Sequence, residues 1–205
     1  MIPVIAVAAP VGGGKTSLVT AIASALGDAA IISYDNYERS TIKSPEEMRR
    51  WMLNGALFDD LPAPGLADDL VRMKRGEAII DPGTGTSIQA KKLIIFEMPL
   101  GREYTATSRF IDYLVWIDTP LDMALARKIK EFIAHLPPGS GERETRAFLS
   151  WLGSYIDSYM DIVGKMLDLQ RERVPVHADL ILDGRNGIEA LVLQALEGIH
   201  NRFPG

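Results

Sequence analysis

The stretch VIAVAAPVGGGKTSLV, residues 4–19, decides which fold to expect of this chain. Residues 2–8 are a short apolar run without polar alternation, which is typical of a strand buried on both faces. Three glycines in a row follow it. The next segment places Leu18, Ile22 and Leu26 at helical spacing and ends at a glycine, a common helix stop. The sequence therefore predicts a strand, a glycine turn and a helix in direct succession.

The glycine turn, residues 9–16, matches the pattern G-x-x-x-x-G-K-[ST] of a phosphate-binding loop, with Ala9 in the place of the first glycine. Glycines let consecutive backbone N–H groups converge on phosphate oxygens, and the helix N-terminus adds about half a positive charge. We expect Lys15 to reach the β- and γ-phosphates and the Thr16 hydroxyl to bind Mg²⁺. The predicted nucleotide-binding residues of the loop are Gly12, Gly13, Gly14, Lys15, Thr16 and Ser17. The alternative, a structural turn that contains Lys-Thr by chance, is disfavoured by the strand and helix on either side of it.

The composition is that of an ordinary globular protein, with 205 residues of which 47% are hydrophobic and 24% charged. A chain of this length can bury about 70% of its unfolded surface without disulfides or structural metals. It contains no cysteine, which excludes disulfide scaffolds, thiolate zinc sites and cysteine nucleophiles. A net charge of −5 argues against a nucleic-acid partner, and no apolar run approaches the roughly 18 residues of a membrane span. The N-terminal run lacks the basic segment of a signal peptide, so we expect a cytoplasmic protein that does not bind membranes.

Strand and helix patterns alternate along the rest of the chain. Further buried strands are expected at residues 29–38, 91–100, 112–120 and 178–184, and helices at 44–53, 65–76, 120–136, 145–173 and 187–199. This order predicts an α/β fold, a P-loop NTPase-type parallel sheet covered by helices on both faces. The longest helix is expected to break near Gly164, and its aromatic series from Phe148 to Tyr159 recurs at helical spacing, which favours a core-facing stripe.

Ligands of such sheets bind beyond the carboxyl ends of the strands, and two carboxylates stand there. Asp35 follows the second strand and could accept the proton of an attacking hydroxyl or hold Mg²⁺ through water. Glu97 lies at the end of the third strand, where a buried carboxylate is costly unless it is paired or linked to a metal. We predict that Thr16, Glu97 and Asp35 form the Mg²⁺ site. A helix-capping Asp35 and a structural Glu97 are the alternatives.

A basic helix precedes the glycine-rich loop at residues 137–142. Arg127, Lys128 and Lys130 lie on it, and a mobile segment could bring such cations to the transferred phosphoryl group. We favour a catalytic role for Arg127. The alternative is a solvated helix face, which is the usual role of isolated basic residues.

The motifs APVGGGKTSL, SYDNY, LIIFEMPL, VWIDTPLDMALARKI and HADLILDGRNG occur in an order that resembles the uridine kinase and phosphoribulokinase-like branch of the P-loop kinases. The resemblance spans nearly the whole chain. It implies one kinase domain over residues 1–205, with an acceptor-side insertion at about 36–90 and a lid at about 127–147. It also implies that Asp35 is the base that activates the acceptor hydroxyl.

The resemblance extends to further site residues. It places Glu97 near Mg²⁺ and makes Arg127 a lid arginine. It places Asp59 or Asp60 beside the acceptor hydroxyls. The loop DGRNG would lie beside the adenine ring, which makes Arg185 and Asn186 nucleotide-binding residues.

The acceptor side departs from the family pattern. Uridine kinases usually carry an aromatic- and histidine-bearing hairpin before the FE strand, but residues 77–92 contain neither residue type. Nucleoside-specific members also tend to have arginine where this chain has Ala124. Since a site built to hydrogen-bond one substrate discriminates strongly, uridine itself is not the expected acceptor.

The sequence therefore predicts an ATP-dependent kinase that transfers the γ-phosphoryl group to a hydroxyl of a small molecule, with ATP and Mg²⁺ as its cofactors. One alternative is a regulatory module that binds nucleotide and phosphorylates nothing. Another is a nucleoside monophosphate kinase, which needs arginines on the acceptor side; the obvious supply is MRRW at residues 48–51. A homo-oligomer is compatible with the sequence.

Overall fold

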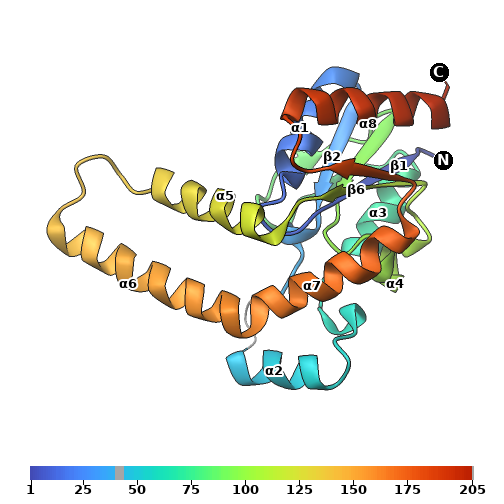
Figure 1. Cartoon of the computed structure of the whole chain (residues 1–205). Coiled ribbons are helices and arrows are strands. Elements are labelled where there is room, and N and C mark those ends of the chain that lie inside the picture. The colour runs from blue at the N-terminus through green and yellow to red at the C-terminus, as the bar shows by residue number, and fades with distance from the viewer. Residues whose placement is uncertain (40–43, 205) are drawn as a thin grey trace.

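A computed structural model describes residues 1–39 and 44–204 of the chain. Its centre is a five-stranded parallel sheet in the order β2-β5-β1-β6-β7 (Figure 1). The strands are β1 Val4–Ala8, β2 Ala29–Ser33, β5 Leu93–Glu97, β6 Tyr113–Asp118 and β7 Leu180–Asp183. Helices cover both faces of the sheet, so the predicted α/β fold is confirmed. No helix in the described part of the chain is long and apolar enough to cross a membrane.

The central strand β1 explains why its sequence is apolar without alternation. Every residue of β1 is fully buried. Side chains of a strand point alternately to the two faces, so Ile5 and Val7 belong to one hydrophobic cluster and Val4, Ala6 and Ala8 to the other. Both faces of this strand therefore need apolar side chains.

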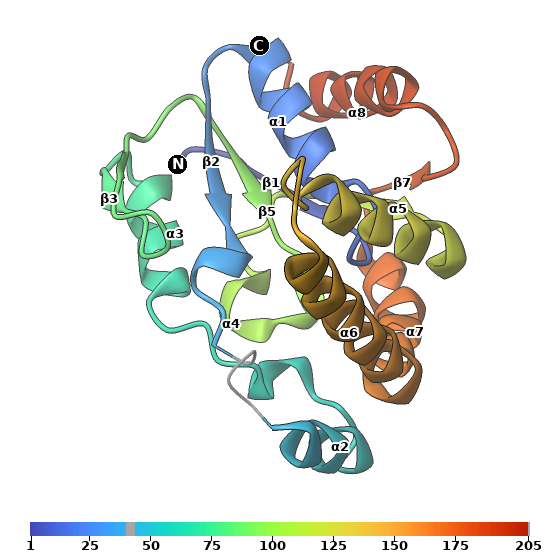
Figure 2. The ribbon, with the colours of Figure 1, turned by 90° about the vertical axis from the view of Figure 1, so that its left-hand side faces the viewer.

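The two clusters are covered by different helices (Figure 2). Helices α1, Lys15–Leu26, and α8, Ile188–Arg202, pack against the first cluster. The second is covered by α3, Leu66–Lys74, by α7, Gly164–Arg173, and by the short α4, Thr105–Ser108. Short 3₁₀ turns lie between these elements, at Tyr34–Asn36, Phe58–Asp60, Gly101–Glu103 and Val174–His177.

The region between β2 and β5 contains α2 and a small hairpin. Helix α2, Pro45–Leu53, begins at a capping box in which Ser44 Oγ accepts from the Glu47 N–H at 3.3 Å and the Glu47 carboxylate accepts from the Ser44 N–H at 2.6 Å. The hairpin pairs β3, Ile79–Ile80, with β4, Ser87–Ile88, in antiparallel register.

Helices α5, Leu121–Ala134, and α6, Glu142–Ser158, form a pair that projects from the sheet (Figure 1). The expectation of a core-facing aromatic stripe on the second helix was wrong: none of the described residues of α6 is buried, and Trp151 is 47% exposed. Phe132 of α5 instead packs edge-on against Trp151 and Tyr155, with ring centroids 4.9 Å apart in both pairs. The helix extends beyond the sheet, so α5 is the main apolar surface available to it.

The break expected near Gly164 is present. A π-helical segment, Tyr159–Val163, separates α6 from α7. Such wide turns are often found at functional sites.

Candidate active site

The glycine loop between β1 and α1 is shaped by its contact with α5. Gly12 has φ +76° and Gly14 has φ +93°, the left-handed region that favours glycine. A Cβ on Gly12 would also lie 2.1 Å from the carbonyl oxygen of Ala124, whereas a Cβ on Gly14 would meet no atom within 4 Å. The residue type at position 12 is therefore fixed by the backbone of α5 as well as by the turn.

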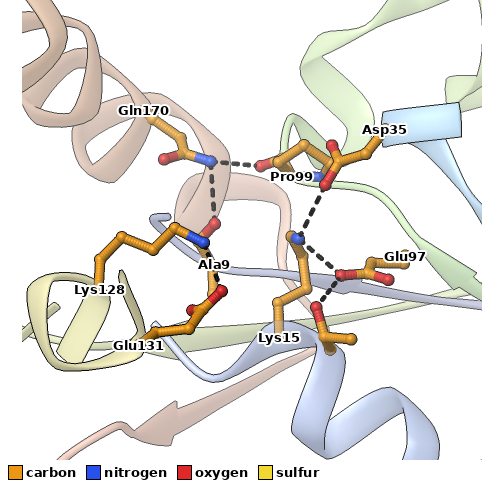
Figure 3. Close-up of polar contacts among 9 residues, drawn as sticks. Ala9, Lys15, Asp35, Glu97, Pro99, Lys128, Glu131 and Gln170 are labelled. Carbon is orange, nitrogen blue, oxygen red and sulfur yellow. Dashed lines mark hydrogen bonds and ion pairs between the residues drawn. The ribbon is translucent and has the colours of Figure 1, made fainter. Parts of the chain in front are cut away.

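Two buried side chains that the sequence reasoning missed hold this loop. The Thr119 hydroxyl donates to the Gly13 carbonyl at 3.0 Å. The Gln170 amide nitrogen donates to the carbonyls of Ala9, at 3.2 Å, and Pro99, at 2.7 Å (Figure 3). Gln170 thus joins the start of the loop to the segment after β5. Their partners are main-chain carbonyls distant in sequence, so no local motif marks them.

A cavity of about 510 Å³ lies over the loop. It is lined by five of the six predicted loop residues and by two of the predicted catalytic side chains: Gly12, Gly14, Lys15, Thr16, Ser17, Asp35 and Arg127. Pro10, Val11, Lys128 and Glu131 complete the lining. A chamber of this size is within the range of small-molecule sites. The structure therefore brings the predicted loop, base and lid arginine to one place.

Lys15 and Thr16, which line this cavity, form a compact polar cluster with the buried Glu97. Lys15 Nζ and Thr16 Oγ1 both donate to Glu97 Oε1, at 2.8 and 2.6 Å (Figure 3). Burial raises the pKa of the Glu97 carboxyl, but the Lys15 charge and the hydrogen bonds from Lys15, Thr16 and Ser33 outweigh burial and hold this pKa below its usual value. Glu97, at 6% exposure, is therefore a buried carboxylate that is kept ionised.

Asp35 faces this cluster from the 3₁₀ turn after β2. Its Oδ2 lies 3.9 Å from Lys15 Nζ, and its side chain remains 65% exposed. The pKa of Asp35 is raised because the surrounding protein displaces water and Glu97 and Glu38 repel the charged form, while Lys15 and Lys128 oppose this shift. The carboxylate oxygens are open to an incoming group, as a base requires.

The turn that carries Asp35 is fixed by its two following residues. Asn36 Nδ2 donates to Asp81 Oδ2 at 2.7 Å, and the Tyr37 hydroxyl donates to Asp69 at 3.0 Å. Asp81 is 4% exposed and also accepts the N–H groups of Gly83 and Thr84. Burial alone would raise the pKa of Asp81, but these hydrogen bonds lower it. No local motif in the sequence indicates that this turn, at residues 81–85, anchors the neighbour of Asp35.

The predicted metal ligands are chemically suited to Mg²⁺. Thr16 and Asp35 line the cavity, Glu97 accepts a hydrogen bond from the Thr16 hydroxyl, and hard oxygen ligands are those that Mg²⁺ prefers. Residues 1–39 and 44–204 hold no cluster of three or more His, Cys, Asp or Glu side chains with metal-binding geometry. Nucleotide-bound Mg²⁺ usually takes only one or two protein carboxylates and completes its shell with phosphates and water, so this donor set fits it.

A second cavity of about 350 Å³ meets the first at Asp35. Val11, Lys15 and Asp35 line both chambers. The rest of the second chamber is largely apolar and comes from the turn at residues 58–61, the segment after β5, and the π-helical segment with α7. Asp35 therefore stands between a polar chamber over the glycine loop and an apolar one beside α7.

Asp59 and Asp60 are not brought to either cavity, although Phe58 and Leu61 of the same turn line the second one. Asp59 accepts hydrogen bonds from the N–H and hydroxyl of Thr105, at 2.7 and 2.9 Å, at the start of α4. Its carboxylate is thus engaged at a helix N-terminus, where negative charge is favourable. The structure gives no support for the predicted acceptor-binding role of either aspartate.

The loop predicted to lie beside adenine is linked to the first cavity through Arg127. Arg127 Nη2 donates to the Gly184 carbonyl at 3.0 Å, next to Arg185 and Asn186. Arg185 itself turns back to Asp183, 3.4 Å away, and is not part of the cavity lining. The contact of Arg185 and Asn186 with adenine stays a prediction.

Searches against protein-family models and curated protein sequences found no match. Solved structures do match. A possible uridine kinase from Bacillus stearothermophilus is 14% identical, with 89% of each chain covered and a TM-score of 0.53. A sugar kinase from Janibacter sp. HTCC2649 is 16% identical, with 97% of this chain and 95% of that chain covered and a TM-score of 0.48. A gluconokinase from Sinorhizobium meliloti 1021 is 20% identical, with 97% of this chain and 92% of that chain covered and a TM-score of 0.48. The first likeness shows that the chain shares the fold of that structure.

Proposed function

We propose that this protein is an ATP-dependent kinase that phosphorylates a hydroxyl of a small molecule other than uridine. The observation that carries the proposal is the position of Asp35 between two cavities that share Lys15 and Val11. The larger one has the glycine loop of a nucleotide phosphate site, and the smaller one has the apolar lining of a small-molecule site. A kinase needs this arrangement because donor and acceptor must meet in line at one phosphorus atom.

The reaction follows from the placement of the side chains. The acceptor hydroxyl enters from the smaller cavity and gives its proton to the Asp35 carboxylate. Its oxygen forms a bond to the γ-phosphorus of ATP while the bond from that phosphorus to the bridging oxygen breaks, and ADP leaves. Lys15 and the loop N–H groups stabilise the charge on the phosphate oxygens. Bound Mg²⁺, held through Thr16 and the carboxylate of Glu97, would neutralise further charge on the phosphates.

Arg127 and the loop 183–187 complete the proposed donor site. Arg127 lines the cavity and is held by the Gly184 carbonyl. We propose that it contacts the transferred phosphoryl group, and that Arg185 and Asn186 contact the adenine ring. The α5–α6 pair would act as the lid.

The alternatives are less well supported. A regulatory module has no need of a carboxylate base facing a second cavity. A nucleoside monophosphate kinase needs arginines around the acceptor phosphate, but neither Arg49 nor Arg50 is in the lining of the second cavity, and Arg49 bonds to Asp161 at 3.1 Å.

The test is transfer of labelled γ-phosphate from ATP to a panel of nucleosides, sugars and other alcohols. Lys15→Ala should abolish product with any acceptor that is found. Lys91→Ala removes the same charge at an exposed position outside both cavities and should leave product formation unchanged. ATP binding without product across the whole panel would refute the kinase and favour the regulatory module.

A further inference from the structure

The second cavity has a charge pattern that restricts what it can bind. Among the described residues that line it, three carry charge: Lys15, Asp35 and Glu38. Lys15 is already paired with Glu97 at 2.8 Å and faces the phosphate loop. An anionic group in this cavity would therefore lie against two carboxylates with no cation of its own, and burying an unpaired charge is costly.

Two residues that line the same cavity carry buried polar atoms that lack partners. The described residues hold three buried side-chain polar atoms without a hydrogen bond, on Tyr34, Trp116 and Gln170. Tyr34 and Gln170 line this cavity, and each is 3% exposed. Trp116 lies in the core of the sheet. Unpaired buried polar groups are rare in folded proteins, so two on one cavity indicate a missing hydrogen-bonding partner.

The chemistry of these two atoms is well defined. The Gln170 amide nitrogen donates to two carbonyls, which fixes the amide orientation and leaves its oxygen as the free acceptor (Figure 3). The Tyr34 hydroxyl has no partner and carries a hydrogen that it can donate. Two residues of the cavity lining therefore carry one unpaired donor and one unpaired acceptor, both uncharged, beside apolar walls that include Leu61, Met166 and Leu167.

We propose that the acceptor is an uncharged alcohol with an apolar face, held by hydrogen bonds to Tyr34 and Gln170, and that molecules carrying a carboxylate or a phosphate are rejected. This inference rests on the proposed function, because it takes the second cavity as the acceptor site. Tyr34 and Gln170 are then the residues that select the acceptor, and Glu38 contributes to the rejection of anions. A cavity near 350 Å³ is at the small end of ligand sites, which favours an acceptor no larger than a nucleoside.

The first test compares two probes of the same shape, 4-(hydroxymethyl)benzamide and 4-(hydroxymethyl)benzoate, with the full chain in the presence of ADP and Mg²⁺. Binding is read from the methyl resonance of Met166, assigned with a Met166→Leu variant, because Met166 lines the cavity. The amide should bind at least about tenfold more tightly than the acid. Equal or tighter binding of the acid would overturn the inference. So would the absence of any shift with either probe at about 10 mM, a concentration that saturates a site with a Kd of about 1 mM.

Two variants test the named residues. Tyr34→Phe removes an unpartnered hydroxyl, so it should weaken amide binding without lowering the melting temperature of the free protein; unchanged affinity would remove Tyr34 from the proposal. Glu38→Gln should reduce the ratio of the affinities for the amide and the acid. Glu172 is exposed and lies outside the cavity, so Glu172→Gln should leave this affinity ratio unchanged.

Phosphoryl transfer to both classes of alcohol is measured in parallel and separates the two proposals. Binding of the amide with no phosphorylated product from any alcohol would refute the kinase and leave the cavity assignment standing. Preferential phosphorylation of acids would refute the assignment and leave the kinase standing.

Discussion

Alanine at Gly12 and alanine at Gly14 should have different effects, although both glycines lie in the same loop. Both have positive φ, so a side chain at either costs about 1–2 kcal/mol of backbone strain. Only Gly12 also meets the α5 backbone, where the new Cβ would lie 2.1 Å from the Ala124 carbonyl oxygen. This distance is far shorter than an ordinary van der Waals contact. Overpacking of this kind typically costs a further ~1–3 kcal/mol of stability.

The assay is thermal unfolding of the nucleotide-free variants. An extra 1–3 kcal/mol corresponds to about 2–12 °C in a domain of this size, so Gly12→Ala should melt lower than Gly14→Ala by that amount. Measuring without nucleotide removes any clash of the new methyl groups with phosphate. Equal melting temperatures, or a lower one for Gly14→Ala, would refute the close packing of the loop on α5, and with it the position of Arg127.

Three further predictions concern the carboxylates. The rate of phosphoryl transfer should fall at acid pH as Asp35 is protonated, with an apparent pKa above 3.8. Glu97→Gln should move this acid limb of the pH–rate profile to lower pH, because Glu97 raises the pKa of Asp35. An acid limb at the same pH in the variant would contradict the electrostatic coupling of the two carboxylates. Folding lowers the pKa of Glu97, so the ionised carboxylate stabilises the fold fully above pH 4.5, and this stabilisation is lost as the pH falls through the lowered pKa. Glu97→Gln should therefore reduce the free energy of unfolding, measured with urea, by about 1–3 kcal/mol at neutral pH and by less at pH 3. Asp81→Ala should reduce kcat with little change in the KM for ATP, because it frees Asn36 beside the base; a change confined to the KM for ATP would argue against this positioning role.

The donor half of the site could be predicted from the sequence because its signals are local. The strand, the three glycines, Lys15 and Thr16 occupy adjacent positions, and the apolar run of β1 predicted a strand buried on both faces. Asp35 and Glu97 followed from the rule that ligands bind at the carboxyl ends of parallel strands. In the structure Lys15, Thr16 and Asp35 line one cavity, and Glu97 accepts hydrogen bonds from Lys15 and Thr16.

The acceptor half could not be predicted in this way. Gln170 contacts Ala9, which is 161 positions away in sequence, and its role depends on how α7 crosses the sheet. In the turn that contains Asp59, the side chains that line the cavity are the apolar Phe58 and Leu61, whereas both aspartates are exposed and Asp59 accepts hydrogen bonds at the start of α4. The aromatic stripe of α6 had helical spacing, and spacing alone does not say whether a helix packs on the sheet or extends beyond it.

The most direct test of the central claim, that Asp35 is the base between the donor and acceptor cavities, is a comparison of wild type and Asp35→Asn. ATP·Mg²⁺ binding is measured by calorimetry, and phosphoryl transfer is measured with the same preparations. Asparagine keeps the shape and cannot take the proton, so ATP affinity should be retained while transfer falls about 10²–10⁴-fold. Wild-type transfer by the variant would contradict the claim.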